Sequence, residues 1–423
     1  MPLLRAIPLV LLCALGPSAQ HPAERAASVA RQDPRYLAAA QAVDDGYDRF
    51  VAELIALAET AAPPFLEDAR AEAFARLARA SGITDVARDD EGNVLAMRRG
   101  SGGPLLVVSA HLDTVFPEGT DVTVRREGTR LSAPGISDNA QGLAALLAVA
   151  RALDAASVAT TADVLFVASV GEEGSGALRG MRHLFTTGRH AGRIGMFIAI
   201  DGSGDGSFVT TGGVGSRRYR VTFHGPGGHS YGAFGLVNPA YALAGAIQHL
   251  TAVRVPSSPK TTFSVGMIGG GTSVNTIPSS AWMDVDLRSE APDALAELDH
   301  AFHDAVARAV DSENQSRATM RGAITATVDL QGERPSGRTP PTTALVETAS
   351  AAIRATGLVP QHGSSSTDAN LPMSLGIPAI TIDTGLRGGR AHAPDEWLDV
   401  ERRMTVDGLQ RVLLIVLSAA GMP

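Results

Sequence analysis

The chain has 423 residues, of which 44% are hydrophobic and 19% are charged, and its formal net charge is -8. This composition is typical of a globular protein with enough apolar material for a large core, so a disordered chain is excluded. The mild acidity provides no basic surface of the kind that nucleic acid requires, so nucleic acid is excluded as a partner.

The first element expected along the chain is a secretory signal peptide over residues 1–19. Arg5 gives a basic start, an apolar run extends from Ile7 to Leu15, and small residues lie near Ala19, where we expect cleavage. The apolar run is too short to span a bilayer, so we expect no transmembrane anchor. The pattern indicates an exported protein, periplasmic or secreted, and the alternative is a cytosolic N-terminus.

The one cysteine, Cys13, lies inside this leader, so the mature chain is expected to contain none. Stability must then come from burial of the core and not from disulfides. Any metal ion must be held by histidine and carboxylate side chains, which favours an open catalytic site over a structural zinc site.

After the leader, helical stretches alternate with short apolar runs. Apolar residues at helical spacing predict helices between Pro34 and about Ala80, and further helices over residues 141–153 and 177–185. The runs expected to form strands are residues 93–97, 105–108, 164–168 and 196–200. This alternation predicts an α/β fold with a mostly parallel sheet covered by helices on both faces.

The residue pattern of the sequence changes near Gly212, where a glycine-rich hinge precedes an expected strand of alternating polar and apolar residues. The elements expected beyond it are strands at 218–223, 263–267 and 282–287 and helices at 240–250 and 294–310. Alternation with exposed polar faces predicts a small inserted α+β unit, with a sheet and helices on one side, that forms a lid. The resemblance described below implies that it is also a dimerisation domain. We place it at residues 214–328.

The catalytic domain is therefore expected in two parts, residues 35–213 and 329–423. A loose connection over residues 331–342 leads back into it. Its second part is expected to contain a helix at 342–355, a strand at 379–382 and a terminal helix at 401–417.

Metal-ligand side chains directly follow several of the expected strands. Because ligands of open α/β sheets bind at the carboxyl ends of the strands, these side chains are expected to converge. Each cluster alone has an ordinary explanation as a turn or surface group, but the ordered set predicts one metal site. Its members are His111, Asp113, Glu172, Glu173, Asp201 and His392, with Asp138 in a turn before a helix.

The segments HLDTVFPEG, GISDNAQG, GEEGSGALRG, AIDGSG and RAHAPDEW resemble the metal motifs of the aminoacylase, carboxypeptidase G and peptidase T family of co-catalytic zinc hydrolases. The resemblance spans residues from about 40 to about 420. It implies two Zn²⁺ ions, with Co²⁺ or Mn²⁺ as substitutes. The ligands that it implies are His111 and Asp201 for one ion, Glu173 and His392 for the other, and Asp138 as a bridge between them.

The same resemblance implies a catalytic role for Glu172, which would stay uncoordinated and act as general base. Asp113 would orient His111, since ligating imidazoles generally need such a partner. Two zinc ions lower the pKa of a shared water and polarise the scissile carbonyl. A general base contributes on the order of a hundredfold to ten-thousandfold in rate.

The inserted segment supplies a second set of expected site residues. In the family that the chain resembles, a histidine at the position of His229 stabilises the oxyanion, usually from a partner subunit's lid, which implies a homodimer or a lid that closes within one chain. Asn275 and Arg288 would grip the substrate carboxylate, to which a guanidinium binds through two parallel hydrogen bonds. Asp368 and Asn370 in SSSTDANLP are expected to organise the substrate loop.

The favoured function is zinc-dependent exopeptidase action on short peptides, because HLDTVFPEG and AIDGSG lean toward the peptidase T and carboxypeptidase G side and export suits peptide scavenging. The runner-up is an N-acyl-amino-acid deacylase of the acetylornithine or succinyl-diaminopimelate type, which uses the same zinc machinery. A non-catalytic binding protein on the same fold and a lidless aminopeptidase are the remaining alternatives.

Overall fold

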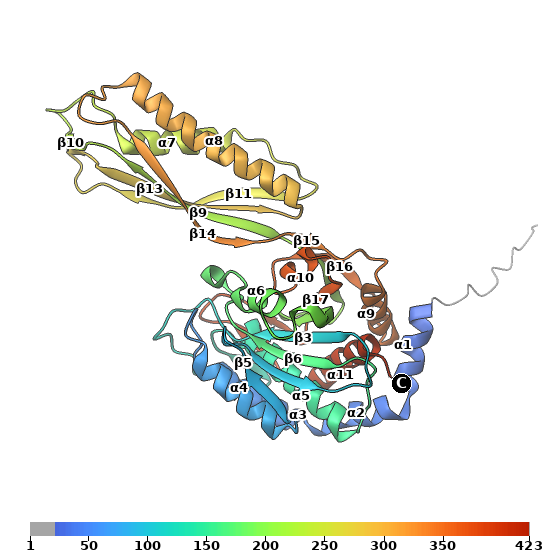
Figure 1. Ribbon diagram of the computed structural model, residues 1–423. Helices are drawn as coiled ribbons and strands as arrows, with labels where there is room; N and C mark the ends of the chain where they lie inside the picture. The colour runs from blue at the N-terminus through green and yellow to red at the C-terminus, as the bar shows by residue number, and fades with distance from the viewer. Residues whose placement is uncertain (1–21, 423) are drawn as a thin grey trace, which may run out of the picture.

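The apolar runs of the chain form the centre of one nine-stranded sheet in the computed structural model, which describes residues 22–422 (Figure 1). Strands β6, β3, β7 and β17 lie side by side and run parallel, and antiparallel strands border them. The α/β expectation with a largely parallel sheet is confirmed. The strands, in sheet order, are β1 (Asp85–Arg88), β2 (Val94–Arg98), β6 (Val164–Ser169), β3 (Leu105–His111), β7 (Ile194–Ile200), β17 (Ala379–Ile382), β8 (Phe208–Gly213) and β15 (Gly337–Arg338), with β16 (Gln361–Ser365) also paired to β8.

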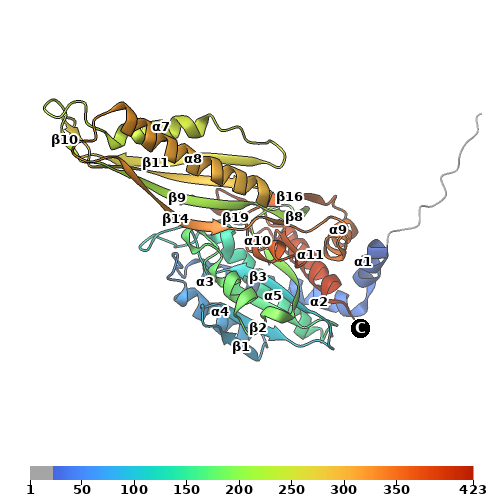
Figure 2. The same cartoon turned by 45° about the horizontal axis from the view of Figure 1, so that its top comes forward.

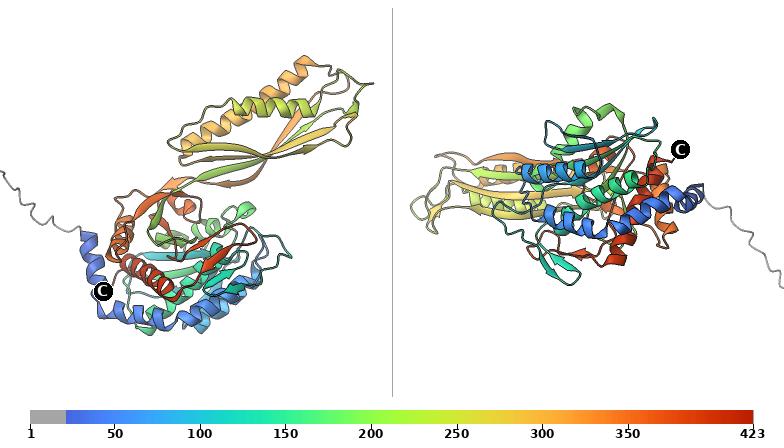
Figure 3. Two further views of the ribbon diagram at one scale, coloured as in Figure 1. Left: turned by 180° about the vertical axis from the view of Figure 1, so that it is seen from behind. Right: turned by 90° about the horizontal axis from the view of Figure 1, so that it is seen from below.

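Helices cover both faces of this sheet because its strands are apolar on both sides. Val108 and Phe166 pack on one face with α5 and α11, whereas Val107 and Leu165 pack on the other with α6 and α10. The helices are α1 (Pro22–Gln32), α2 (Pro34–Asp45), α3 (Tyr47–Ala58), α4 (Asp68–Ala80), α5 (Gln141–Ala155), α6 (Arg179–Thr186), α9 (Ala344–Ala355), α10 (Asn370–Ser374) and α11 (Arg402–Ala420). Figure 3 shows this body from behind and from below.

A separate four-stranded antiparallel sheet projects from the body, in the order β11-β13-β9-β14 (Figure 2). Two helices pack on one of its faces around a core of its own that includes Val221, Phe223 and Phe302. The elements are β9 (Gly215–His224), α7 (Pro239–Thr251), β11 (Thr261–Gly270), β13 (Ser280–Ser289), α8 (Pro292–Ser316) and β14 (Thr325–Arg334). The short strands β10 (Gly228–His229) and β12 (Thr276–Ile277) pair at its outer tip. We call this unit the lid.

The return path from the lid differs from the loose connection expected from residue 331. Residues 331–334 continue β14, which pairs with β9 as far as Arg334, and the boundary expected at residue 328 falls inside this strand. The sequence did not reveal β14 because it is an edge strand with mostly exposed side chains, so its hydrophobic alternation is weak.

Between residues 22 and 422, no helix is both long and apolar enough to cross a bilayer. The expected signal peptide over residues 1–19 and Cys13 lie outside the described residues. The remaining short strands form a sheet beside the site in the order β18 (Gly388–Gly389), β19 (Trp397–Asp399), β5 (Arg130–Ser132) and β4 (Arg125–Glu127).

Candidate metal centre

The carboxyl ends of three adjacent parallel strands bring the expected ligands together. His111 is the last residue of β3, Asp201 directly follows β7, and Glu172 and Glu173 lie in the turn after β6. Asp138 enters from the segment before α5, together with His392 from the loop between β18 and β19. Segments far apart in sequence therefore meet at one edge of the sheet, as parallel topology requires.

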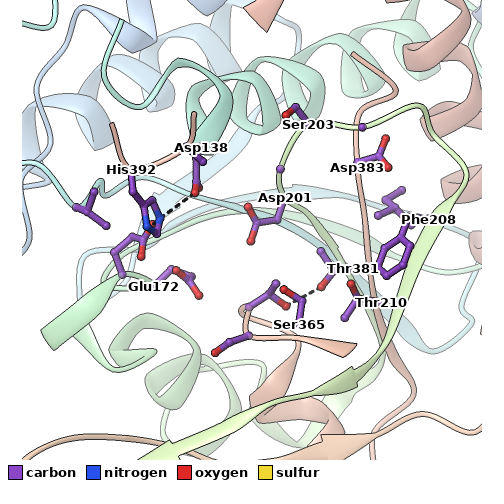
Figure 4. Close-up of a pocket in the computed structure, with 18 of the residues that line it drawn as sticks. Asp138, Glu172, Asp201, Ser203, Phe208, Thr210, Ser365, Thr381, Asp383 and His392 are labelled. Atoms are coloured by element: carbon purple, nitrogen blue, oxygen red, sulfur yellow. Dashed lines mark hydrogen bonds and ion pairs between the residues drawn. The ribbon is translucent and has the colours of Figure 1, made fainter. Parts of the chain in front are cut away.

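The contacts divide these side chains into two sets that share Asp138. His111 Nε2 lies 2.9 Å from Asp138 Oδ1 and 3.6 Å from Asp201 Oδ1. His392 Nε2 lies 3.2 Å from Asp138 Oδ2 and 3.0 Å from Glu173 Oε1 (Figure 4). Within each set the potential ligand atoms lie within 4.8 Å of one another. The carboxylate of Asp138 thus presents one oxygen to each set.

The tautomer of His111 favours a cation in this centre. Its Nδ1 lies 3.0 Å from the main-chain oxygen of Asp113 and donates a hydrogen bond to it. A neutral imidazole then directs the Nε2 lone pair at the oxygens of Asp138 and Asp201, so acceptors face acceptors. A proton or a metal ion must lie between them. Nitrogen and carboxylate ligands in this number suit a divalent metal of the zinc type.

The raised pKa values of the two histidines also indicate a cation site. Burial lowers the pKa of His111, but hydrogen bonds to Asp113, Asp138 and Asp201 outweigh it and hold the pKa well above its ordinary value. Hydrogen bonds to Asp138 and Glu173 raise the pKa of His392 to about 10. Burial raises the pKa of Asp201. Both imidazoles therefore experience a strong negative field, which is the field that binds a cation.

Asp113 has a wider role than the resemblance implied. Its main-chain oxygen holds His111, whereas its carboxylate lies 3.7 Å from His111 Nδ1. That carboxylate, fully buried, accepts hydrogen bonds from the amides of Glu172 (3.0 Å) and Glu173 (2.7 Å). Asp113 therefore fixes a ligand on β3 and the turn after β6 at once.

Glu396, which was not among the expected site residues, anchors the Asp138 segment. Its buried carboxylate accepts hydrogen bonds from the amides of Gly135 (3.1 Å), Ser137 (2.6 Å) and Asp138 (2.8 Å), and from the Ser137 hydroxyl (2.8 Å). Glu396 belongs to RAHAPDEW, the same segment as His392. The sequence motif therefore included Glu396, but an acidic residue in a loop is usually an ordinary surface group.

Two arginines of the lid strands also escaped the sequence analysis. Arg334, at the end of β14, is buried and its Nη1 lies 2.8 Å from Glu172 Oε1. Arg218 on β9 donates from Nη1 to the carbonyl of Gly174 at 3.0 Å. Burial raises the pKa of Glu172 well above its ordinary value, and the charge of Arg334 opposes this effect.

Asp368 contacts the end of β6, and Asn370 supports the two segments that join the body to the lid. Asp368 is buried, accepts a hydrogen bond from Ser169 Oγ at 2.6 Å, and burial raises its pKa to about 7. Asn370 donates to the carbonyls of Val214 (2.8 Å) and Pro335 (3.0 Å), so it ties together the two chain crossings between body and lid.

A cavity of about 660 Å³ opens between the metal-ligand cluster and the lid. Arg218 and Arg288 line it, and both bond the carboxylate of Asp286. Figure 4 shows Asp383 and Phe208 on the side of the cavity remote from His392 and Glu172.

Two expected site residues lie elsewhere in the same chain. His229 is exposed on β10, and Asn275 is exposed beside it, where its carbonyl accepts a hydrogen bond from the amide of Ser230 (2.9 Å). Both are at the outer tip of the lid, far from the cluster (Figures 1 and 2). The structure therefore brings Arg288 to the cavity but not His229 or Asn275.

A family model decides the relationship of the chain to known proteins. The model described as peptidase family M20/M25/M40 matches residues 107–410. The chain belongs to this family. The match includes every expected ligand from His111 to His392, so the clustered side chains lie within the shared region.

Known proteins of similar sequence or fold are consistent with this membership. Succinyl-diaminopimelate desuccinylase of Bordetella petrii is 29% identical over 238 residues, which are 52% of this chain and 62% of the relative. The alignment thus spans about three fifths of that relative's length. Aminopeptidase PepT of Bacillus cereus has a TM-score of 0.71 at 19% identity, covering 89% of this chain and 99% of that one. A tripeptidase of Staphylococcus aureus has a TM-score of 0.72 at 19% identity, covering 88% and 98%. These structures show the shared fold.

Substitutions of Asp138, which both ligand sets share, and of Asp113, which supports other ligands, should separate direct from indirect metal contacts. Asp113→Ala should lower the affinity for divalent metal by about 10–100-fold. It frees the Glu173 turn and the ring of His111 to move, but it removes no metal ligand. Asp138→Ala should lower the affinity further, since both sets lose a ligand. Metal content after dialysis measures this, with exposed Asp121→Ala as control. Wild-type metal content in Asp138→Ala would contradict the assignment.

Proposed function

We propose that this M20 protein is an exopeptidase that uses two zinc ions to hydrolyse an amide bond in short peptides. The observation that carries the proposal is the pair of ligand sets that share Asp138, with Glu172 facing the same cavity. In this assignment His111 and Asp201 would hold one ion, Glu173 and His392 would hold the other, and Asp138 would be a ligand of both. A non-catalytic binding protein would have no need to keep both ligand sets and the adjacent base.

Bound zinc would supply a water of lowered pKa and polarise the scissile carbonyl. Glu172 would act as the general base that accepts a proton from the attacking water and donates it to the leaving amine. Its Oε1 accepts a hydrogen bond from Arg334, so the other carboxylate oxygen is available for the proton. Arg288 and Arg218 line the lid side of the cavity, where guanidinium groups suit a substrate carboxylate.

Glu172→Gln should retain bound zinc and lose a hundredfold to ten-thousandfold in kcat, on the order of the contribution of a general base. Neighbouring Glu173→Gln is the matched variant, and it should lose metal as well as turnover. Activity assays with metal analysis on both proteins distinguish the two roles. Full activity of Glu172→Gln would remove Glu172 as the base.

The charges that line the cavity support a peptide with two free ends as substrate. Asp205 and Asp383 lie in the lining together with three lid arginines, so the cavity offers groups of both signs. The arginines are Arg218, Arg288 and Arg334. Burial raises the pKa of Asp383 to about 6, so it is mostly ionised at neutral pH. A free peptide carries an ammonium group and a carboxylate. N-acetyl-alanine lacks the ammonium group, whereas N-succinyl-diaminopimelate keeps one at its other amino group and carries a further carboxylate on the succinyl group.

Asp383→Asn should therefore raise KM for Ala-Ala about tenfold or more, because a charge-assisted hydrogen bond contributes about 1.5–3 kcal/mol. KM for N-acetyl-alanine, which has no ammonium group, should not change. Exposed Asp121→Asn serves as control. Faster turnover of N-succinyl-diaminopimelate than of Ala-Ala by the wild type would favour the deacylase alternative, to which the curated relative's name belongs.

We further propose a homodimer in which one lid tip completes the site of the other subunit. His229 and Asn275 lie at a tip that also exposes Tyr231 (89%), Phe234 (84%) and Val274 (102%). Strand β11 is an open edge of the lid sheet and exposes Met267 and Ile268. Exposed apolar side chains and an unpaired edge both favour a second protein surface. The leader pattern of residues 1–19 supports export of this dimer.

Co-expression of His229→Ala and Glu172→Gln subunits tests the shared site. Each variant alone should be nearly inactive. The mixture should recover about a quarter of wild-type activity, because half of randomly formed dimers are mixed and each has one intact site. No recovery in dimers shown to be mixed would place His229 in its own subunit's site.

A further inference from the structure

Arg334 connects the root of the lid to the base. It is the last residue of β14, paired with Ser216 of β9, and therefore belongs to the lid sheet. Its side chain leaves that sheet and enters the body, where only 5% of it is exposed. Nη1 donates to Glu172 Oε1 at 2.8 Å and to Ser366 Oγ at 3.0 Å, and Nη2 donates to the main-chain oxygen of Glu172.

We propose that Arg334 is a positioning residue that fixes the carboxylate of Glu172 for proton transfer by holding its side chain and its main chain with one planar group. The proposal rests on Glu172 as the base. It goes beyond that function because it assigns the orientation of the base to a strand of the lid and not to the catalytic domain that carries Glu172.

The form of the contact is specific for arginine. A guanidinium has five N–H donors in a rigid plane, so it can bond the carboxylate and the carbonyl of one residue without bending. A lysine ammonium preserves the positive charge but is a single point on a flexible stem. If Arg334 only balanced the carboxylates around it, lysine would serve. If it positions Glu172, lysine should fall short.

The turn that carries Glu172 is held on three sides. Asp113 accepts hydrogen bonds from the amides of Glu172 and Glu173, and Arg218 binds the carbonyl of Gly174. These contacts fix the main chain of the turn, but none of them reaches the Glu172 carboxylate. Arg334 supplies that contact. A misplacement of about 1 Å in a catalytic group can cost about 10²-fold in rate.

Arg182 provides a matched control at the same junction. Its Nη2 donates to the main-chain oxygen of Glu333 at 2.7 Å, and its Nε donates to Ala177 at 3.0 Å. It therefore also links the body to the end of β14 through a guanidinium. It lines neither the cavity nor the ligand cluster. Loss of Arg182 weakens the junction without touching the base.

The experiment measures kcat and KM for Ala-Ala with the zinc-loaded wild type, Arg334→Ala, Arg334→Lys and Arg182→Ala, together with zinc content and thermal midpoint. Arg334→Ala should lose about 10²-fold in kcat at unchanged KM and zinc content. Arg334→Lys should lose at least about tenfold in kcat, because lysine keeps the positive charge but lacks the planar set of N–H donors. Arg182→Ala should retain wild-type kcat. Added guanidinium chloride should restore part of the kcat of Arg334→Ala.

Several outcomes would overturn the proposal. A rise in KM at constant kcat would make Arg334 a substrate anchor, and equal losses in Arg182→Ala would make it a structural link. If Arg334→Ala does not fold, Arg334→Lys decides, and wild-type kcat in that variant contradicts positioning. Glu172→Gln, assayed in parallel, separates the two proposals. If it is inactive while Arg334→Ala is fully active, only the positioning role fails, whereas an active Glu172→Gln removes the base itself.

Discussion

The structure depends on carboxylates that are packed at one sheet edge more closely than their charges alone permit. Asp138 lies between two imidazoles, and Asp201 and Glu173 complete the sets around it. Like charges at such distances, with little water between them, oppose folding unless cations compensate them. The site therefore has a built-in demand for positive charge. Bound metal ions would compensate the charges of the ligand carboxylates, and Arg334 compensates the charge of Glu172.

Two buried acids that do not belong to the ligand sets maintain this arrangement through main-chain amides. Asp113 accepts from the turn of Glu172 and Glu173, and Glu396 accepts from the segment of Asp138. A buried carboxylate is costly unless it is fully hydrogen-bonded, and several N–H donors provide that compensation. Each acid thus fixes a loop whose side chains would otherwise be free to separate.

The sequence predicted most of the fold because its central strands are apolar on both faces and end in ligand residues such as His111 and Asp201. It also predicted that these side chains converge, since parallel topology brings strand ends together. The division of the ligands into two sets that share Asp138 was implied by the family resemblance. The sequence did not predict Arg334 or Glu396. Their roles depend on contacts between residues far apart in the chain, Arg334 with Glu172 and Glu396 with Ser137, and a polar residue on an edge strand or in a loop has no periodic signature. The edge strand β14 was missed for the same reason.

A single antiparallel sheet spans the lid from the body to the outer tip (Figure 2). Strand β9 begins beside the body, where Arg218 binds Gly174, and runs to His224 before the tip that carries His229. Its pairing with β13 and β14 is continuous over this length, apart from one irregularity between Leu330 and Gly332. A hydrogen-bonded sheet with its own core transmits displacement from root to tip as a nearly rigid unit. Movement of the tip against a neighbouring surface would therefore also move the guanidinium groups that hold the Glu172 turn.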